Sequence, residues 1–281
     1  MGFEDNTVQT ALRQLASRLR LAGVPSPEVD ARELVMLALG LSRTELLTRA
    51  GQALSAEEGQ ALDALARRRE AREPLQHLLG QIEWAGLTLH VSPAALIPRP
   101  ETEGLLLLAQ DALREVNRPR VLDVGTGTGA LALGLKQLRP DAAVTASDVS
   151  AAALALARQN AKRNGLNVSF VQADLLSGLA GPFDLLLSNP PYLPERDAQA
   201  AQPEVAFDPA LALYSGPDGL TLARRLMADA PRVLAPGASV LLELDPRNVG
   251  VLAAELRALG WNAEVHPDLS GRERFLLARK S

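Results

Sequence analysis

The tetrapeptide Asn189-Pro190-Pro191-Tyr192 has the residue types of a binding site for a planar NH2 group. An asparagine side chain supplies a carbonyl acceptor, and two prolines stiffen the backbone while leaving its carbonyl oxygens free to accept hydrogen bonds. Asn189 and Pro190 can therefore accept both hydrogens of an amide or amine nitrogen, and we expect Tyr192 to pack against the planar group and exclude water. A plain proline-rich turn is the simpler interpretation, but the position of the motif behind a glycine loop favours a site.

A nitrogen held in this way can attack an electrophilic carbon without strong activation. A methyl group on a sulfonium leaves behind a neutral thioether, so positioning alone supplies much of the barrier reduction. No metal, covalent nucleophile or strong general base is required. The tetrapeptide is therefore typical of methyl transfer from S-adenosylmethionine to an amide or amine nitrogen, with Asn189 and Pro190 as the catalytic residues.

A glycine-rich segment supplies the expected cofactor site. The sequence RVLDVGTGTGALALGL runs from a buried strand pattern directly into a helical pattern. Glycines at such a junction allow a sharp turn and close approach of a ligand to the backbone, and the helix start offers unpaired amides. The spacing is G-x-G-x-G rather than the dinucleotide pattern G-x-G-x-x-G. The predicted cofactor residues here are Gly125, Thr126, Gly127, Thr128 and Gly129.

Two acids follow later strands of the same predicted sheet. Asp148 ends the strand after the glycine loop, where an acid accepts hydrogen bonds from ribose hydroxyls. It is also placed to cap a helix, although Ser150 is the better cap. Asp174 ends the third strand and either receives the exocyclic amine of adenine or is a solvated loop acid.

Composition limits the classes of function. The 281 residues are 47% apolar and 22% charged, as in ordinary globular chains. A net charge of -4 does not favour binding to bulk nucleic acid, and the absence of cysteine excludes disulfides and thiolate metal sites. The start of the chain has no basic stretch followed by an apolar one, and no apolar run reaches membrane-spanning length. We expect a cytoplasmic protein without membrane contact.

The first part of the chain, residues 1–73, is predicted to be a small all-helical domain. Ser26, followed by Pro27, is expected to cap a helix, and Ser42 with Glu45 and Ser55 with Glu58 form two capping boxes. Residues 74–98 are predicted to be a linker, in which alternating apolar residues around Ala85-Gly86 indicate a β-hairpin.

Residues 99–281 alternate between strand and helix patterns, which predicts an α/β domain with a mainly parallel sheet. Helices are expected to begin near Gly129, Ser150, Gly219 and Asn248. The predicted strands are Arg120–Val124, Ala143–Asp148, Val168–Gln172, Asp184–Ser188, Ser239–Glu243, Ala263–His266 and Phe275–Ala278.

These motifs together resemble a class I methyltransferase and, more narrowly, the release-factor glutamine N5-methyltransferase family. The glycine loop and Asn-Pro-Pro-Tyr are shared with methyltransferases that act on amino groups of adenine or guanine. Three further segments are similar to the narrower family, and the likeness spans nearly the whole chain: PLQHLLG (74–80), LIPRPETE (96–103) and FDPALALYSGPDGL (207–220). The resemblance implies a Rossmann-like methyltransferase sheet and an N-terminal domain that helps to dock a class I peptide chain release factor.

The resemblance also assigns roles within the site. It implies that Gly125 to Gly129, Asp148 and Leu175 line the S-adenosylmethionine site, with Asn189 contacting the cofactor as well as the substrate. Some members carry an aromatic residue at the position of Leu175 to stack on adenine, and Leu175 departs from that pattern. The residues Asn189, Pro190, Pro191 and Tyr192 would bind the glutamine of the Gly-Gly-Gln motif. Arg99, Thr102 and Glu103 are left out of the predicted site, because a helix cap explains part of their segment.

Three other functions remain as alternatives. An amino-group methyltransferase acting on adenine N6 or guanine N2 would use the same tetrapeptide on a flipped base, but it should have a basic channel and stacking aromatics. Aromatic residues are only 3% of this chain, which favours a protein substrate. A non-catalytic adaptor would not need both loops, and a nicotinamide dehydrogenase fits the glycine spacing poorly.

Overall fold

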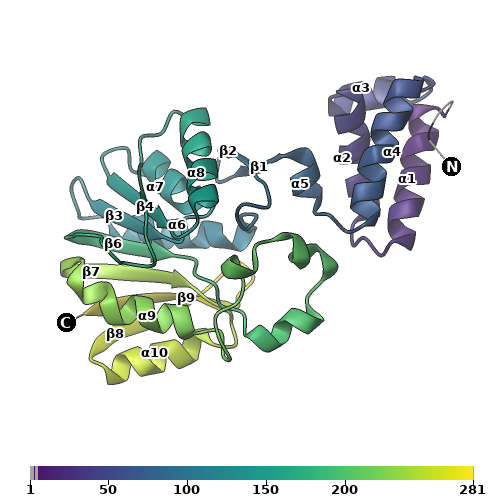
Figure 1. The fold of residues 1–281 in the computed structure, drawn as a ribbon. Helices are drawn as coiled ribbons and strands as arrows, with labels where there is room; N and C mark the ends of the chain where they lie inside the picture. The colour runs from purple at the N-terminus through teal and green to yellow at the C-terminus, as the bar shows by residue number, and fades with distance from the viewer. Residues whose placement is uncertain (1–2, 4–5, 281) are drawn as a thin grey trace. The chain divides into compact units, whose positions relative to one another are not determined.

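The computed structural model describes residue 3 and residues 6–280 (Figure 1). Met1, Gly2, Glu4, Asp5 and Ser281, which fall at the ends of the domains predicted above, lie outside the described residues. The chain forms two compact units. One unit contains Met1–Gln81 together with Gln202–Phe207, and the other contains Ile82–Ala201 and Asp208–Ser281. Among the described residues, no helix combines the length and the apolar character needed to cross a membrane.

The smaller unit is helical. Its helices are α1 (Val8–Leu21), α2 (Pro27–Leu39), α3 (Arg43–Thr48), α4 (Ala56–Glu70) and α5 (Leu75–Leu79), and the segment 202–207 contributes the 3-10 helix η3 (Pro203–Phe207). Fully buried leucines such as Leu15, Leu34 and Leu62 form its core. Both predicted capping boxes are present, at the starts of α3 and α4.

Two details of this unit differ from the sequence prediction. Ser26 makes no side-chain capping bond, because its backbone angles of φ -128° and ψ 61° lie outside the extended region that a capping serine adopts. The predicted linker also begins with a short helix, α5, for which Pro74 is the N-cap. A proline is compatible with a helix start, where its missing N–H has no intrahelical partner.

The larger unit is an α/β domain. Its elements begin with a hairpin, β1 (Gln81–Trp84) and β2 (Leu87–His90), whose turn is the predicted Ala85-Gly86. The sheet strands are β3 (Arg120–Val124), β4 (Ala143–Asp148), β5 (Ser169–Gln172), β6 (Phe183–Ser188), β7 (Leu234–Glu243), β8 (Trp261–Pro267) and β9 (Glu273–Lys280). The α-helices are α6 (Glu103–Ala112), α7 (Ala130–Leu138), α8 (Ala151–Arg163), α9 (Thr221–Asp229) and α10 (Val249–Ala258). Short 3-10 turns are η1 (Pro100–Thr102), η2 (Glu195–Ala200), η4 (Ala210–Ala212) and η5 (Ala230–Arg232).

The strands form one sheet in the order β5-β4-β3-β6-β7-β9-β8. Strands β3 to β7 are parallel to one another, and β9 pairs antiparallel with both β7 and β8. The predicted α/β class and mainly parallel Rossmann-like sheet are therefore confirmed. Strand β7 begins at Leu234 rather than at the predicted Ser239.

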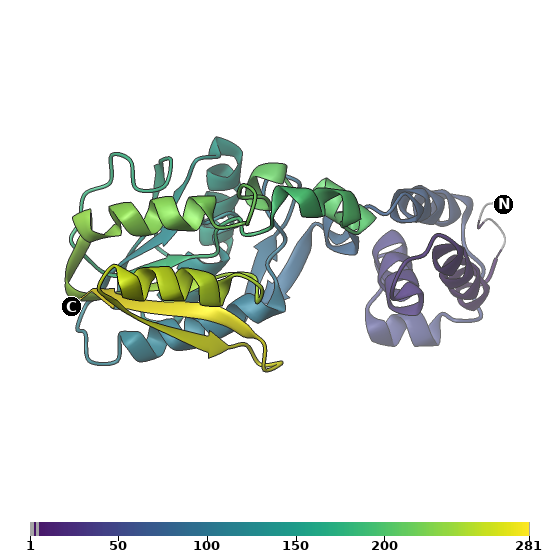
Figure 2. The ribbon, with the colours of Figure 1, turned by 90° about the horizontal axis from the view of Figure 1, so that it is seen from below.

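Helices cover both faces of this sheet (Figures 1 and 2). Alternate residues of a strand point to opposite faces, so the central strands must be apolar throughout. On β6, Leu186 belongs to the core beneath α9 and α10, whereas Leu185 and Leu187 belong to the core beneath α6 and α7. The unbroken run of three leucines at 185–187 in β6 follows from burial on both sides.

The strand order places a switch point between β3 and β6. The chain leaves β3 toward β4 and β5 on one side and returns to β6 on the other side of β3. Connections on the two sides of such a point diverge and leave a crevice beyond the carboxyl ends of the strands. The segments that follow β3 and β6 are the glycine loop and Asn-Pro-Pro-Tyr, so the topology brings them to one crevice.

Candidate active site

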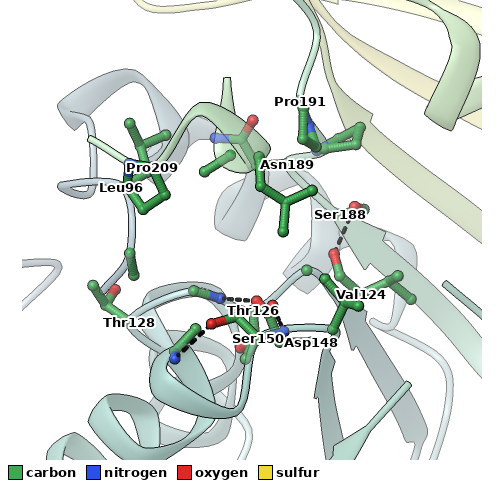
Figure 3. A pocket seen from close by; sticks show the side chains of 18 of the residues that line it. Leu96, Val124, Thr126, Thr128, Asp148, Ser150, Ser188, Asn189, Pro191 and Pro209 are labelled. Carbon is green, nitrogen blue, oxygen red and sulfur yellow. Dashed lines mark hydrogen bonds between the residues drawn. The ribbon is translucent and has the colours of Figure 1, made fainter. Parts of the chain in front are cut away.

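A cavity of about 450 Å³ lies at this crevice (Figure 3). Its size suits a ligand of drug or cofactor dimensions. Figure 3 shows Asn189 and Pro191 on one side of the cavity and Thr126, Asp148 and Ser150 on the other. Ten of the twelve residues predicted from sequence line it: Gly125, Thr126, Gly127, Thr128, Asp148, Asp174, Leu175, Asn189, Pro190 and Pro191. Gly129 and Tyr192 are the two that do not.

The glycine loop turns back across the end of β3. The backbone amides of Gly125 and Thr126 both donate to the carbonyl of Ser147 on β4, at 2.8 and 2.9 Å. Gly125 has φ 71° and open space where a Cβ would stand, so its backbone faces the cavity directly. A Cβ on Gly129 would lie 3.2 Å from that of Ala157, so this glycine allows close packing between α7 and α8.

Asp148 holds the loop in place from the end of β4. One carboxylate oxygen accepts the backbone amide of Gly127 at 2.9 Å, and the other accepts that of Ser150 at 2.9 Å. Ser150 itself caps α8, because its hydroxyl accepts the backbone amide of Ala153. A carboxylate has about four lone-pair positions, so Asp148 keeps acceptor capacity for a ligand hydroxyl. Asp148 is thus held in position by the glycine loop, next to which it would bind a ligand.

Asp174 and Leu175 form another part of the cavity wall. Asp174 accepts a hydrogen bond from Arg225 at 3.0 Å, and both side chains are more than half exposed. An exposed pair of this kind contributes little to stability, so Asp174 is available to a ligand at low cost. Leu175 adopts φ 49° and packs against the core below α9.

A buried acid lies beneath the glycine loop. Asp123 on β3 is 1% exposed, and it accepts hydrogen bonds from the Thr126 hydroxyl at 2.6 Å and the Ala132 amide at 3.2 Å. Burial raises the pKa of Asp123 to about 7, against the opposing effect of these two donors. Asp123 therefore joins the loop to the first turn of α7 and stands behind the cavity wall.

Asn189 follows the last residue of β6. Its side-chain nitrogen Nδ2 donates to the Thr102 hydroxyl oxygen at 3.3 Å, which leaves the amide oxygen Oδ1 as an acceptor for a ligand. Pro190 also lines the cavity, and no backbone amide of the described residues donates to its carbonyl. Asn189 and Pro190, the two residues predicted to supply acceptors, therefore lie together at the cavity wall.

Tyr192 supports the loop from outside the cavity. Its ring packs against the core below α9 and α10, and burial raises the pKa of Tyr192 to about 12. The backbone carbonyl of Tyr192 accepts the side-chain amide of Asn248 at 3.1 Å. A Cβ on Gly219 would lie 2.1 Å from the same carbonyl oxygen. The segment 207–220 and the start of α10 thus fix the loop from behind.

Arg99 and Thr102 also line the cavity, although the sequence prediction left them out of the site. Thr102 makes no capping bond at the start of α6 and contacts Asn189 instead, so the explanation by a helix cap was wrong. Arg99 forms an ion pair with the buried Asp208 at 3.5 Å. Two segments noted for their resemblance, LIPRPETE and FDPALALYSGPDGL, therefore meet beside the cavity. In the sequence, the likeness of both segments to one family was the signal that could have pointed to Arg99 and Thr102.

The arrangement has the parts needed for transfer to a planar nitrogen. One wall offers glycine-loop backbone and carboxylates, and the opposite wall offers two uncharged acceptors. Among the described residues, no group of three or more His, Asp or Glu side chains is arranged to hold a metal ion.

Comparisons of this chain with protein families, with related proteins and with solved structures all find methyltransferases. Residues 103–210 match the Methyltransferase small domain family, and residues 10–80 match the PrmC N-terminal domain family. A release factor glutamine methyltransferase of Deinococcus radiodurans is 59% identical over 271 residues, which cover 96% of this chain and 97% of the relative. One from Streptomyces coelicolor is 41% identical, with 98% and 99% covered. A solved 16S rRNA methyltransferase of T. thermophilus has a TM-score of 0.51 at 22% identity, with 72% of this chain and 50% of that chain covered, and so shares the fold.

Proposed function

The chain belongs to the release factor glutamine methyltransferase family, and we propose that it methylates the side-chain amide nitrogen (N5) of the glutamine in the Gly-Gly-Gln motif of class I release factors. The methyl donor in this proposal is S-adenosylmethionine, and the product is S-adenosylhomocysteine. The observation that carries the proposal is that Asn189 and Pro190, which both have an oxygen able to accept a hydrogen bond, line the same cavity as the glycine loop and Asp148.

The residues of the cavity fit this cofactor. Asp148 keeps lone pairs for ribose hydroxyls, and the glycine loop brings bare backbone to the cavity wall. Leu175 offers an apolar surface to adenine in place of an aromatic ring, and Asp174 lies beside it as an acceptor for the exocyclic amine. When bound, S-adenosylmethionine supplies a methyl group on a positively charged sulfur, which departs as a neutral thioether.

The protein's own contribution to the reaction is orientation. Asn189 Oδ1 and the Pro190 carbonyl accept the two hydrogens of the glutamine NH2 group, so the nitrogen lone pair points away from both acceptors and into the cavity. The nitrogen forms a bond to the methyl carbon as the bond between that carbon and sulfur breaks, and one proton of the nitrogen passes to solvent. Pro191 keeps the backbone of this loop rigid, and Tyr192 anchors it in the core.

The helical unit has a separate role in the proposal. A lone glutamine side chain offers little contact area, so recognition of one glutamine in a large protein must use surface far from the reacting nitrogen. None of the described residues in the range 1–73 lines the cavity, and Leu21 and Leu47 on these helices are 89% and 77% exposed. We assign this unit to docking of the release factor. A cytoplasmic location, without direct nucleic-acid binding, completes the proposal.

A transfer assay with methyl-labelled cofactor tests the function. The full-length chain should label a class I release factor and leave unlabelled an RNA or DNA that carries accessible adenine and guanine. Asn189→Ala should lose about 100- to 1,000-fold in rate, because a positioned acceptor in a closed site is lost. Its affinity for the cofactor, measured by calorimetry, should change far less. Label on nucleic acid alone, or an unchanged rate for Asn189→Ala, contradicts the proposal.

A further inference from the structure

A buried acid stands next to Asn189 and has no role in the mechanism above. Glu243 is the last residue of β7 and is 1% exposed. Ser188 of β6 pairs with Leu242 of β7, and Asn189 and Glu243 each follow directly after this pair in the chain. Both carboxylate oxygens of Glu243 lack a hydrogen-bond partner of normal geometry among the described residues. A buried carboxylate without such a partner is costly, so its presence here needs an explanation.

Thr102 connects this acid to the substrate-binding amide. The Thr102 side chain is buried, and its hydroxyl oxygen accepts from Asn189 Nδ2 at 3.3 Å. The same hydroxyl is close enough to lower the pKa of Glu243, although no hydrogen bond of normal geometry joins the two side chains. A hydroxyl has one hydrogen and two lone pairs. An ionised carboxylate can only accept, so it takes the Thr102 hydrogen and leaves a Thr102 lone pair for the Asn189 NH2 group. A protonated carboxyl can donate to Thr102, whose hydrogen is then free to point at Asn189.

We propose that Glu243 is a positioning residue, which acts through Thr102 to set the direction in which the Asn189 amide points. With Glu243 ionised, Asn189 turns its NH2 group to Thr102 and its oxygen to the cavity. With Glu243 protonated, Thr102 can donate to the Asn189 oxygen, and the NH2 group then faces the substrate NH2 group. Two NH2 groups, both hydrogen-bond donors, would then face each other, and the substrate nitrogen would not be held. The inference rests on the proposed function, since it concerns how the glutamine amide is gripped.

The surroundings of Glu243 raise its pKa toward neutral pH. Burial raises the pKa of Glu243 to about 7, with the charge of Glu101 acting in the same direction, while the Thr102 hydroxyl and the charges of Arg274 and Arg99 lower it. Tyr192 also faces Glu243 and stays neutral, because its own pKa is raised to about 12.

Arg274, on the neighbouring strand β9, does not neutralise Glu243 by a direct contact. Its Nε donates to Asp268 at 2.8 Å instead, in an ion pair whose two side chains are both largely buried. Thr102 is therefore the neighbour through which Glu243 can act. A structural ion pair does not explain why this carboxyl is buried.

The test is the pH dependence of kcat for wild type and variants, on a peptide carrying the Gly-Gly-Gln sequence. In wild type, kcat should rise with pH through about 7, because the ionised form of Glu243 is the competent one. In Glu243→Gln this rise should disappear and kcat at high pH should fall about 10- to 100-fold, because the amide no longer enforces one orientation. Cofactor affinity should stay within about twofold of wild type in each variant. The matched control is Glu115→Gln, which neutralises an exposed glutamate and should keep the wild-type profile.

A second pair of variants keeps the test decisive where Glu243→Gln folds poorly. Thr102→Ser retains the hydroxyl and should keep both the rate and the pH dependence, whereas the isosteric Thr102→Val should lose both. A rise near pH 7 that persists in Glu243→Gln or in Thr102→Val overturns the inference, and so does a wild-type profile without it. These results leave methyl transfer by wild type intact, whereas a wild type that methylates no release factor contradicts the proposed function itself.

Discussion

Replacing Gly219 with alanine tests how the Asn-Pro-Pro-Tyr loop is held in position. Gly219 has φ 81°, and an added Cβ would lie 2.1 Å from the carbonyl oxygen of Tyr192 and 2.9 Å from Nδ2 of Asn248. The first neighbour is backbone, so it cannot move away without moving the loop. The same contact also displaces Asn248 from the Tyr192 carbonyl that it holds at 3.1 Å.

The expected cost has two parts. A left-handed backbone costs a residue with a Cβ about 1 to 2 kcal/mol, and the forced steric overlap costs about 1 to 3 kcal/mol more. The free energy of unfolding should therefore fall by about 2 to 5 kcal/mol. Because Tyr192 follows directly on the acceptors at Asn189 and Pro190, a shift of about 1 Å in the loop should lower kcat about 100-fold.

Urea denaturation and methyl transfer to a Gly-Gly-Gln peptide measure the two effects. Gly165→Ala is the matched control, because Gly165 has φ 65° and no atom within 4 Å of an added Cβ. It should lose only about 1 to 2 kcal/mol and keep its activity. Equal stability and equal activity in the two variants would show that the contact with Tyr192 does not hold the loop.

Three further outcomes are expected. Asp148→Ala should weaken binding of S-adenosylmethionine by at least about tenfold in a calorimetric titration, because it removes a ribose acceptor and releases the amide of Gly127. Leu21→Ser and Leu47→Ser should each raise KM about tenfold for intact release factor and leave KM for a short peptide unchanged. The control is Leu269→Ser, which replaces a leucine that is 89% exposed on the other unit and should change neither KM. Because burial raises the pKa of Glu243, the folded state binds the proton of this carboxyl more tightly than the unfolded chain does. The contribution of the protonated carboxyl to stability is therefore full below the ordinary glutamate pKa and is lost as the pH rises through about 7. Urea denaturation should therefore show Glu243→Gln gaining up to about 3 kcal/mol relative to wild type between about pH 5 and about pH 8, and no change in that difference contradicts the assignment.

Local sequence patterns predicted the strands and the two loops, because these depend on neighbouring residues. The run RVLDV and the glycines after it define a buried strand and a tight turn in any context, and the carboxyl ends of parallel strands meet at one edge. Asn189 and Asp148 could thus be assigned to one crevice from their places in the sequence. Asp174 followed from the same rule, whereas Leu175 followed from the resemblance to the family.

The supporting residues could not be predicted in the same way, because long-range packing decides them. Thr102 precedes Asn189 by 87 residues, and nothing in its own segment shows that its hydroxyl meets that amide rather than capping α6. Asn248 and Gly219 reach the Tyr192 carbonyl from two other segments. The sequence predicts Tyr192 as a substrate-facing aromatic, and its partly buried ring packs against the core below α9 and α10.

The helical unit gives a similar example. The sequence prediction separated residues 1–73 from the rest of the chain, whereas the compact helical unit also takes in Gln202–Phe207. Glu204 in that segment accepts hydrogen bonds from Arg69 at 3.0 Å and from Arg72 at 2.6 Å. No periodicity in either segment indicates this contact, because the partners are more than 130 residues apart.

Mass spectrometry of a class I release factor, after incubation with the full-length chain and S-adenosylmethionine, tests the central claim most directly. The proposed function predicts a single added methyl group, located by fragmentation on the side-chain nitrogen of the glutamine in Gly-Gly-Gln, and its loss when the incubation uses Asn189→Ala. A methyl group on another residue, or an unmodified Gly-Gly-Gln glutamine under conditions in which the chain binds the cofactor, would contradict it.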